Sequence, residues 1–457
     1  MTTERLVEIA EKTVKLALKE KIDQAQVTAF LRDTALTRYA NSQIHQNVAS
    51  KAGGVAIKAV KDKRIGTLRI NSLEDEQIQK AVKNVVKIAG VTPPNKDFKS
   101  LPVPQKWAHV RGVFDGETAE CSPDYRAQRV KETIEAAHLK SPKVKAVAGS
   151  FFTGSMAFAI SNSLGVSAWA ELSLASVATT VISRAGVSQG FGSWEQYSRR
   201  VKDLDAVEVA TQAAEKSVRS INPIKVSPGE YEVVLSPLAV SILMSYLGYI
   251  GFSATPYQDG ESFVKYHLNE QVFDEKLTVK DDARDPKSLF TVPVDGEGVP
   301  KRKTQLIEKG VVSESSVCHD SLTAGRERRQ STGHAVPSFL ELGYLRPMPI
   351  NMMASPGDSS VEEMIEDTRR GVFVTRFHYT NPVEPTKAVL TGLTRDGTFL
   401  IEKGEISKPV MNLRYTDSML SALRNIRLVG KELECVEEVT VPAMKLEKLR
   451  FTGVTEY

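Results

Sequence analysis

Two interior stretches of this chain, residues 146–170 and 233–258, run for roughly 25 residues without a charged side chain. Apolar helices of that length could cross a membrane, so both stretches decide the class of fold. Gly, Ser and Thr recur through the first stretch, which favours strands. The second stretch is interrupted by Pro237, Gly248, Gly251 and Pro256. Its continuous helical part is about 14 residues, too short to span, so the sequence predicts a buried core helix and no membrane protein.

The first half of the chain shows the order helix, strands, helix twice. Apolar residues with helical spacing predict helices over 3–20, 72–89 and 203–220. Ser122-Pro123-Asp124 indicates the start of a further helix, which is expected to run to about residue 138. Strands are predicted over 27–32, 54–60, 65–70 and 144–183, with turns at 61–64 and 162–165. Proline-rich stretches at 92–104 and 223–229 read as boundaries. We therefore predict an α+β protein with three segments: 1–95, 110–224 and a mainly β segment over 229–457.

Charge and cysteine content restrict the class of protein. The chain has 457 residues and a formal net charge of +4, a small excess for a dedicated nucleic-acid binder. Three cysteines do not suggest a disulfide scaffold and fit a reducing compartment. Residues 1–10 contain no apolar run of the kind found in signal peptides. These features predict a cytoplasmic protein.

Most of the common catalytic and nucleotide-binding motifs are absent from the sequence. The chain has no GxxxxGK[ST] phosphate loop, no GxGxxG after a strand, no CxxC and no HExxH. Composition and periodicity alone indicate only an α+β protein with several lobes.

A series of short phrases resembles the TldD/PmbA family. They are RYAN at 38–41, IHQN at 44–47, GGVAI at 53–57, LIEKGVV at 306–312, STG at 331–333, PMPIN at 347–351, PGDS at 356–359, GVFVT at 371–375, IEKGEI at 401–406 and PV at 409–410. Each phrase is short, but their order and spacing extend over nearly the whole chain. The resemblance implies three segments, the last a β-rich, barrel-like domain.

TldD-type members of this family resemble zinc peptidases with an HExxxH motif on a helix of the third segment and a later cysteine ligand. Two imidazoles and a thiolate can hold zinc with a water position open, and the glutamate can accept the water's proton. Aligned by the phrase GESF at 260–263, the corresponding helix carries Ser245, Tyr246 and Ile250 in place of His, Glu and His. No histidine occurs between His138 and His267, so a shifted alignment would not restore the motif.

Other histidines and cysteines are candidates for metal ligands. Cys318, His319 and Asp320 are adjacent, and His334 lies fifteen residues beyond His319. Neighbouring residues of a strand point to opposite faces, so Cys318 and His319 are not expected to share a metal ion. Cys435 lies close to the position of the family's cysteine ligand, and a lone buried thiol is the simpler interpretation. We expect structural roles for His45 and His378. For the basic groups we expect solvent-exposed positions and no nucleic-acid site: Lys58, Lys61, Lys63 and Arg64, and Arg326, Arg328 and Arg329.

Three hypotheses follow. The resemblance implies a second type of member, called TldE or PmbA, which lacks the zinc motif and pairs with a TldD-type subunit. The first hypothesis is such a metal-free subunit, in a heterodimer with a zinc-bearing partner or as a homodimer, acting on unfolded or small peptides and enclosing a substrate tunnel. The alternatives are an autonomous peptidase with atypical ligands, and a regulator that binds DNA or gyrase.

Overall fold

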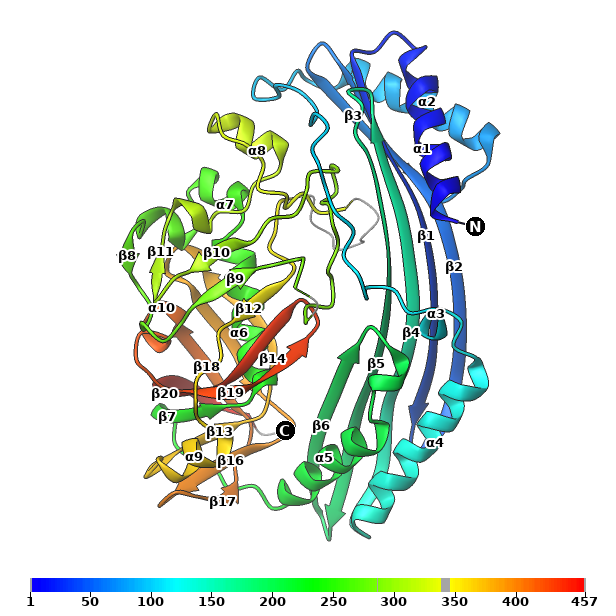
Figure 1. Cartoon of the computed structure of the whole chain (residues 1–457). Helices are drawn as coiled ribbons and strands as arrows, with labels where there is room; N and C mark the ends of the chain where they lie inside the picture. Colours follow the sequence, from blue (N-terminus) through cyan, green and yellow to red (C-terminus); the bar gives the residue numbers. More distant parts are fainter. Residues whose placement is uncertain (1, 286, 338–345, 456–457) are drawn as a thin grey trace.

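The computed structural model describes residues 2–285, 287–337 and 346–455. It shows a long, strongly curved sheet, and a C-terminal domain that lies against the concave side of this sheet (Figure 1). Most helices of the first half lie on the convex side. The fold class predicted from the sequence is confirmed, and the strand pairing adds one feature that the sequence did not reveal.

The curved sheet contains strands from both N-terminal segments. Its strand order is β3-β2-β1-β4-β5-β6, with all neighbours antiparallel. The strands are β1 (Gln24–Ala40), β2 (Gln43–Lys61), β3 (Arg64–Ile70), β4 (Val144–Asn162), β5 (Ser167–Ala185) and β6 (Ser188–Ser198). The helix–strands–helix order is therefore present in each segment, but the two segments share one sheet and one continuous surface.

Strands β1 and β2 are much longer than the sequence pattern indicated. The predicted turn at 61–64 is present, with Asp62 and Lys63 both in the left-handed region, as type I′ hairpin turns require. A second hairpin joins β1 to β2 at Asn41 and Ser42. Residues 43–51 of β2 are exposed on both faces, so they carry no apolar alternation from which a strand could be recognised.

Four helices cover the convex face of the sheet. They are α1 (Thr3–Leu18), α2 (Asp75–Val91), α4 (Pro123–Lys140) and α5 (Ala206–Arg219), with the short α3 (Gly116–Ala119) nearby. Helix α4 begins as predicted, with the Ser122 hydroxyl accepting from the backbone of Tyr125 and proline at the first helical position. Helix α2 begins later than predicted. Its N-cap is Glu74, and the Ser72 hydroxyl accepts from the Glu74 backbone.

The concave face of the sheet is joined to the C-terminal domain by an apolar core. Phe30 and Phe158 of the sheet pack with Val292 and Val294 of that domain, and Trp107 of the linker packs against the same group. The predicted linker, residues 92–104, is part of a longer segment, residues 92–115, that contains no helix or strand and runs along the sheet (Figure 1).

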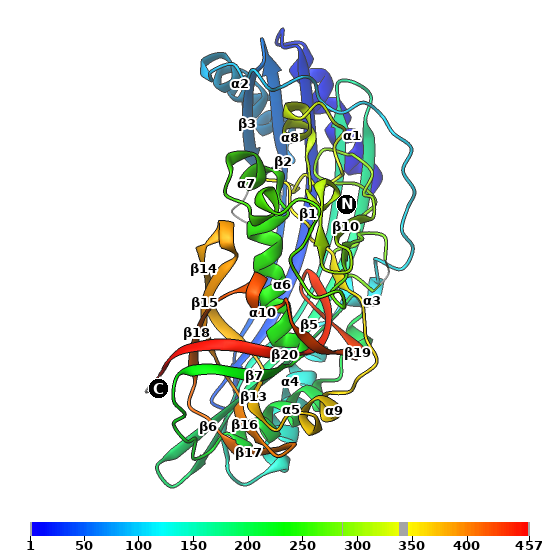
Figure 2. The ribbon, with the colours of Figure 1, turned by 90° about the vertical axis from the view of Figure 1, so that its left-hand side faces the viewer.

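The C-terminal domain is built around helix α6 (Pro237–Gly251), which packs against β7, β14, β19 and β20 (Figure 2). The other helices are α7 (Ala254–Asp259), α8 (Ser321–Arg326), α9 (Val361–Glu366) and α10 (Met419–Ala422). The strands are β7 (Gly229–Leu235), β8 (Glu270–Gln271), β9 (Val279–Asp281), β10 (Thr304–Ile307), β11 (Val311–Val312), β12 (Met352–Ala354), β13 (Arg370–Val374), β14 (Phe377–Glu384), β15 (Val389–Thr394), β16 (Thr398–Glu402), β17 (Glu405–Pro409), β18 (Leu413–Ser418), β19 (Ile426–Val436) and β20 (Val439–Val454).

Twelve of these strands form one branched sheet that curves around α6. The first charge-free stretch forms strands, and the second contains α6, as the sequence predicted. No helix in the described part of the chain is long and apolar enough to cross a membrane.

Candidate functional site

Helix α6 is the element that the family resemblance assigns to zinc chemistry. Proline at its first helical position favours its start, and an apolar face including Leu243 and Leu247 is fully buried. Near its end, a Cβ at Gly251 would lie 2.2 Å from the ring of Phe263, so only glycine allows this contact. The Ser262 hydroxyl donates to the Gly251 carbonyl at 2.6 Å. The GESF phrase therefore fixes the C-terminal end of α6.

The three positions of interest lie on α6 in different surroundings. Ser245 and Tyr246 are half-buried, whereas Ile250 is 3% exposed and belongs to the core of the C-terminal domain. The Tyr246 hydroxyl donates a short hydrogen bond to the Thr380 carbonyl of β14. The Thr380 hydroxyl is in turn 3.0 Å from the hydroxyl of Tyr415. Tyr246 thus holds α6 against β14.

These residues do not fit a zinc ion. Ile250 has no donor atom, and the phenol of Tyr246 is already engaged with the backbone of β14. Serine at position 245 offers a hydroxyl where zinc sites use imidazole or thiolate. Within residues 2–285, 287–337 and 346–455, no three His, Cys, Asp or Glu side chains lie close enough together to hold a metal ion.

Cys318, His319 and His334 are all fully buried, but hydrogen bonds occupy the ring nitrogens of both histidines. His319 contacts the Val317 carbonyl at 2.9 Å and the Glu327 carboxylate at 3.2 Å. His334 contacts the Thr332 hydroxyl at 2.8 Å and the Asp281 carboxylate at 3.0 Å. These partners leave neither ring a nitrogen for a metal, and the two histidines have structural roles.

The buried group around Asp281 is called the matched cluster, because its carboxylate has hydrogen-bond donors and a cation beside it. Asp281 accepts from the Asn351 backbone at 2.7 Å and from His334, and the Lys301 ammonium lies 3.6 Å away. Although burial opposes ionisation, Lys301 and the His334 hydrogen bond lower the pKa of Asp281 to about 2. Burial, and then the Asp281 charge, raise the pKa of the Cys318 thiol well above its usual range. This thiol is a poor nucleophile and a poor metal ligand.

Cys435 lies in β19, in register with Thr440 of β20. Burial raises the pKa of its thiol, and its sulfur is 3.9 Å from the Glu437 carbonyl. His45 and His378 lie in strands β2 and β14.

The basic groups differ partly from the sequence prediction. Lys58 was predicted to be solvent-exposed at a hairpin, but its side chain is only 27% exposed and forms an ion pair with Glu297 of the C-terminal domain at 3.0 Å. The physical reason is that Lys58 lies on the concave face of the sheet, and the C-terminal domain covers this face at that point. Arg326 pairs with Asp97 and Arg329 with Glu314. These pairs reduce the positive charge available to a nucleic acid.

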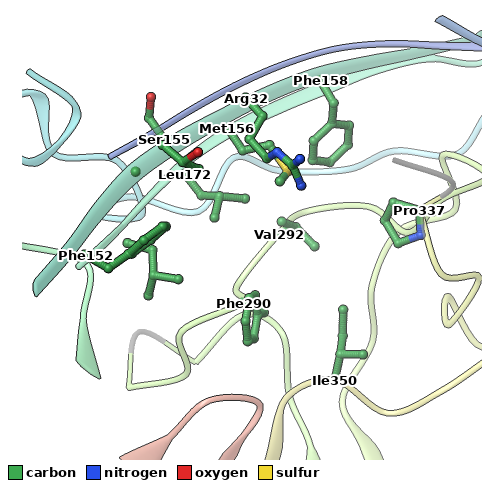
Figure 3. Close-up of a pocket in the computed structure, with 13 residues that line it drawn as sticks. Arg32, Phe152, Ser155, Met156, Phe158, Leu172, Phe290, Val292, Pro337 and Ile350 are labelled. Carbon is green, nitrogen blue, oxygen red and sulfur yellow. The ribbon is translucent and has the colours of Figure 1, made fainter. Parts of the chain in front are cut away.

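An apolar cavity of about 370 Å³ lies between the concave face of the sheet and the C-terminal domain (Figure 3). The sheet contributes Arg32, Met156 and Phe158, and loops of the C-terminal domain contribute Phe290, Val292, Pro337 and Ile350, which face the sheet in Figure 3. The cavity is close to α6, because Pro349, the neighbour of Ile350, packs beside Gly248. Sequence reasoning missed this cavity because its lining comes from segments more than 100 residues apart.

Comparisons with known proteins agree with this architecture. Residues 32–89, 117–221 and 228–453 match the first, central and C-terminal domains of the PmbA/TldA metallopeptidases. Metalloprotease MJ0996 of Methanocaldococcus jannaschii is 23% identical over 91% of this chain and 92% of its own. Metalloprotease PmbA of Escherichia coli is 22% identical over 97% and 96%, respectively.

Solved structures show the same fold. TldE of Thermococcus kodakarensis superimposes with a TM-score of 0.89 and 22% identity, covering 97% of this chain and 100% of that one. The Thermotoga maritima protein TM0727, named for a proposed role as modulator of a DNA gyrase, has a TM-score of 0.86 and 25% identity, with 97% and 99% covered. The three matched domains together span most of the chain, and the protein therefore belongs to the PmbA/TldD metallopeptidase family.

Proposed function

We propose that this chain is a non-catalytic, TldE-like subunit of a TldD/TldE-type metallopeptidase that processes unfolded or small peptides. The observation that carries the proposal is the composition of α6, where Ser245, Tyr246 and Ile250 stand at the positions of the family's His, Glu and His. The buried Ile250 and the Tyr246–Thr380 hydrogen bond give these positions a packing role. The zinc ion would be held by a TldD-type partner.

The apolar cavity of Figure 3 supports a role in enclosing a peptide. Its walls come from Phe152, Met156 and Leu172 on one side and from Phe290 and Ile350 on the other. Walls of this kind suit the side chains of an unfolded segment and offer little sequence discrimination. A peptidase that encloses its substrate between subunits would admit extended chains and exclude folded domains.

The test is reconstitution with an HExxxH-bearing relative from the same genome. We expect a stable complex in sedimentation, with an interface that buries more than roughly 2,000 Å², the range of permanent complexes. A homodimer of this chain, in exchange with the heterodimer, is compatible with the proposal. A chain that remains a monomer at micromolar concentration, with or without that relative, would contradict it.

A further inference from the structure

Part of the outer edge of strand β2 is unpaired. Strand β1 pairs with β2 from Gln43 to Val60, whereas β3 pairs only with residues 55–61. Residues 43–54 therefore have no strand on their outer side among the residues that the structure describes. Side chains 43–51 are all exposed. This free edge, residues 43–54, is roughly 40 Å long and presents unpaired backbone N–H and C=O groups to another chain.

The opposite edge strand of the same sheet, β6, is covered by other elements. A Cβ at Gly190 of β6 would lie 2.1 Å from the Ser217 carbonyl oxygen, so α5 packs directly on this strand. The Ser193 hydroxyl donates to the Asp396 carboxylate of the C-terminal domain at 2.9 Å. Helix α5 and the C-terminal domain thus both contact β6, while the exposed side chains 43–51 of β2 lack such cover.

The free edge also lacks the features that usually prevent pairing with another chain. Natural edge strands are blunted by proline, by charged side chains or by a bulge. Residues 43–54 contain no proline, and Lys51 is their only Lys, Arg, Asp or Glu residue. The Lys51 ammonium is paired with Asp33 of β1 at 2.9 Å. The register with β1 shifts only next to the hairpin, between Arg38 and Tyr39, so the rest of the edge is regular.

Each face of the free edge carries an exposed apolar side chain. Val48 is 40% exposed and lies in one row with Leu36 of β1 and Phe152 of β4. Phe152 lines the cavity of Figure 3, so this row crosses the concave face from the cavity to the edge. Ile44 is 42% exposed and is paired with Tyr39, which is buried beneath α4 on the convex face. A chain that covers both side chains must reach both faces.

The composition of the free edge suits a second copy of the same edge. Two identical strands paired antiparallel about a twofold axis place each residue opposite a residue of the same segment. Around Lys51, which Asp33 neutralises, the segment contains only uncharged polar, histidine, small and apolar residues. Two copies therefore meet without an excess of like charge, and a strongly charged partner finds no opposite charge. A folded copy also reaches both faces, whereas a short peptide does not.

We propose that residues 43–54 form an interface at which two copies of this chain pair edge to edge and antiparallel, so that their curved sheets become one continuous sheet. Backbone hydrogen bonds between the two β2 strands supply the register, and Val48 and Ile44 become buried. The concave wall that begins at Phe152 then continues into the second copy. This interface needs neither zinc nor another type of subunit, so it does not depend on the function proposed above.

The test is sedimentation equilibrium and amide hydrogen exchange on the purified full chain, from submicromolar to tens of micromolar concentration. Alternate amides of an edge strand point outward, and only a pairing strand protects them. We expect a dimer in which the outward amides of residues 43–54 exchange slowly, and faster exchange of the same amides when dilution yields the monomer. A monomer at tens of micromolar would overturn the proposal, as would a dimer in which these amides exchange fast.

Charged variants locate the interface. Val48→Lys and Ala49→Lys each add a positive charge to both copies at exposed positions and should raise the dimer dissociation constant by about tenfold or more. Val187→Lys makes the same change as Val48→Lys at a fully exposed turn between β5 and β6 and should leave dimerisation unchanged. If Val48→Lys fails to fold, Ala49→Lys and the exchange data still decide the question.

Two outcomes would overturn the assignment to a second copy. One is wild-type dimerisation by the folded edge variants. The other is a chain that is monomeric alone and whose outward amides become protected only with the HExxxH-bearing relative, because the edge would then belong to that partner. The second outcome leaves the proposed subunit function intact, so the two proposals fail separately.

Discussion

Two buried clusters in this protein contain aspartates whose pKa values are shifted in opposite directions. In the matched cluster, Asp281 has a donor on each oxygen and a nearby lysine, and its pKa is lowered to about 2. In the second group, the unmatched cluster, Asp295 and Asp320 lie near the Glu297 carboxylate, and burial, followed by the charge of Glu297, raises the pKa of both aspartates. Both clusters are buried, so burial alone does not distinguish them. The charge of the neighbouring groups does, because Lys301 lies beside Asp281 whereas the Glu297 carboxylate lies near Asp295 and Asp320.

The largest effect on stability is expected when charged and polar groups are placed at packed positions that offer them no partner. The triple variant Ser245→His, Tyr246→Glu, Ile250→His places a carboxylate and two imidazoles on α6 and removes the Tyr246–Thr380 hydrogen bond. We expect a loss of about 5 kcal/mol or more, or failure to fold, and no efficient peptidase activity. Ser245→His alone, at the half-buried position, is the control and should be tolerated. Melting temperature, zinc content and casein cleavage are the measurements. Zinc-dependent cleavage with unchanged stability would show that a complete metal site survives.

Removal of Asp281 should produce the next largest effect. Asp281→Ala leaves Lys301 buried without its carboxylate, and a broken buried pair costs about 3–5 kcal/mol. The matched comparison is Asp320→Asn in the unmatched cluster. Asparagine keeps an acceptor for the backbone and hydroxyl of Thr323, so stability should change little. Equal losses in chemical denaturation would remove the distinction between the clusters.

The pH dependence of stability should have opposite signs in the two clusters. The folded pKa of Asp281 is below its unfolded value, so its contribution of about 2 kcal/mol is present above pH 4 and is lost as the pH falls toward 2. The raised pKa values of Asp295 and Asp320 act oppositely, because stability is lost as the pH rises above their unfolded value. Melting curves of wild type, Asp281→Asn and Asp320→Asn between pH 3 and 8 would separate these contributions. Parallel curves would contradict the assignment.

The smallest effect concerns a single hydrogen bond. Tyr246→Phe keeps the ring and removes the donor to the Thr380 carbonyl, which should cost about 1 kcal/mol. Tyr266→Phe, which removes the donor to the Gly260 carbonyl from an exposed ring, is the control and should cost less. A neutral Tyr246→Phe would show that α6 is held by apolar packing alone.

The sequence predicted the elements that carry a strong local signal. Helices α1 and α6 and strands β4 and β5 are rich in buried small or apolar residues, helix α4 begins at a Ser-Pro capping signal, and all of them were found close to their expected bounds. The first half of β2 has both faces exposed and was missed. The joining of two segments into one sheet was also missed, because strand pairing across more than 100 residues leaves no local pattern.

The candidate sites depended even more on distant contacts. The absence of the family's zinc-binding residues could be predicted from Ser245, Tyr246 and Ile250 once the family resemblance was recognised. The environment of Lys58 was not visible, because its partner Glu297 is 239 residues away in the chain. The hydrogen bond from Gln26 to the Gly296 carbonyl could not be predicted either, since only the fold brings Gly296 and α8 over that part of the sheet.

The proposed function requires that this chain carries no catalytic metal of its own. The most direct measurement is zinc content and peptide cleavage for three samples: this chain alone, its HExxxH-bearing relative alone, and the two together. We expect no stoichiometric zinc and no cleavage for this chain alone, and higher cleavage by the mixture than by the relative alone. Near-stoichiometric zinc in this chain alone, with chelator-sensitive cleavage, would contradict it.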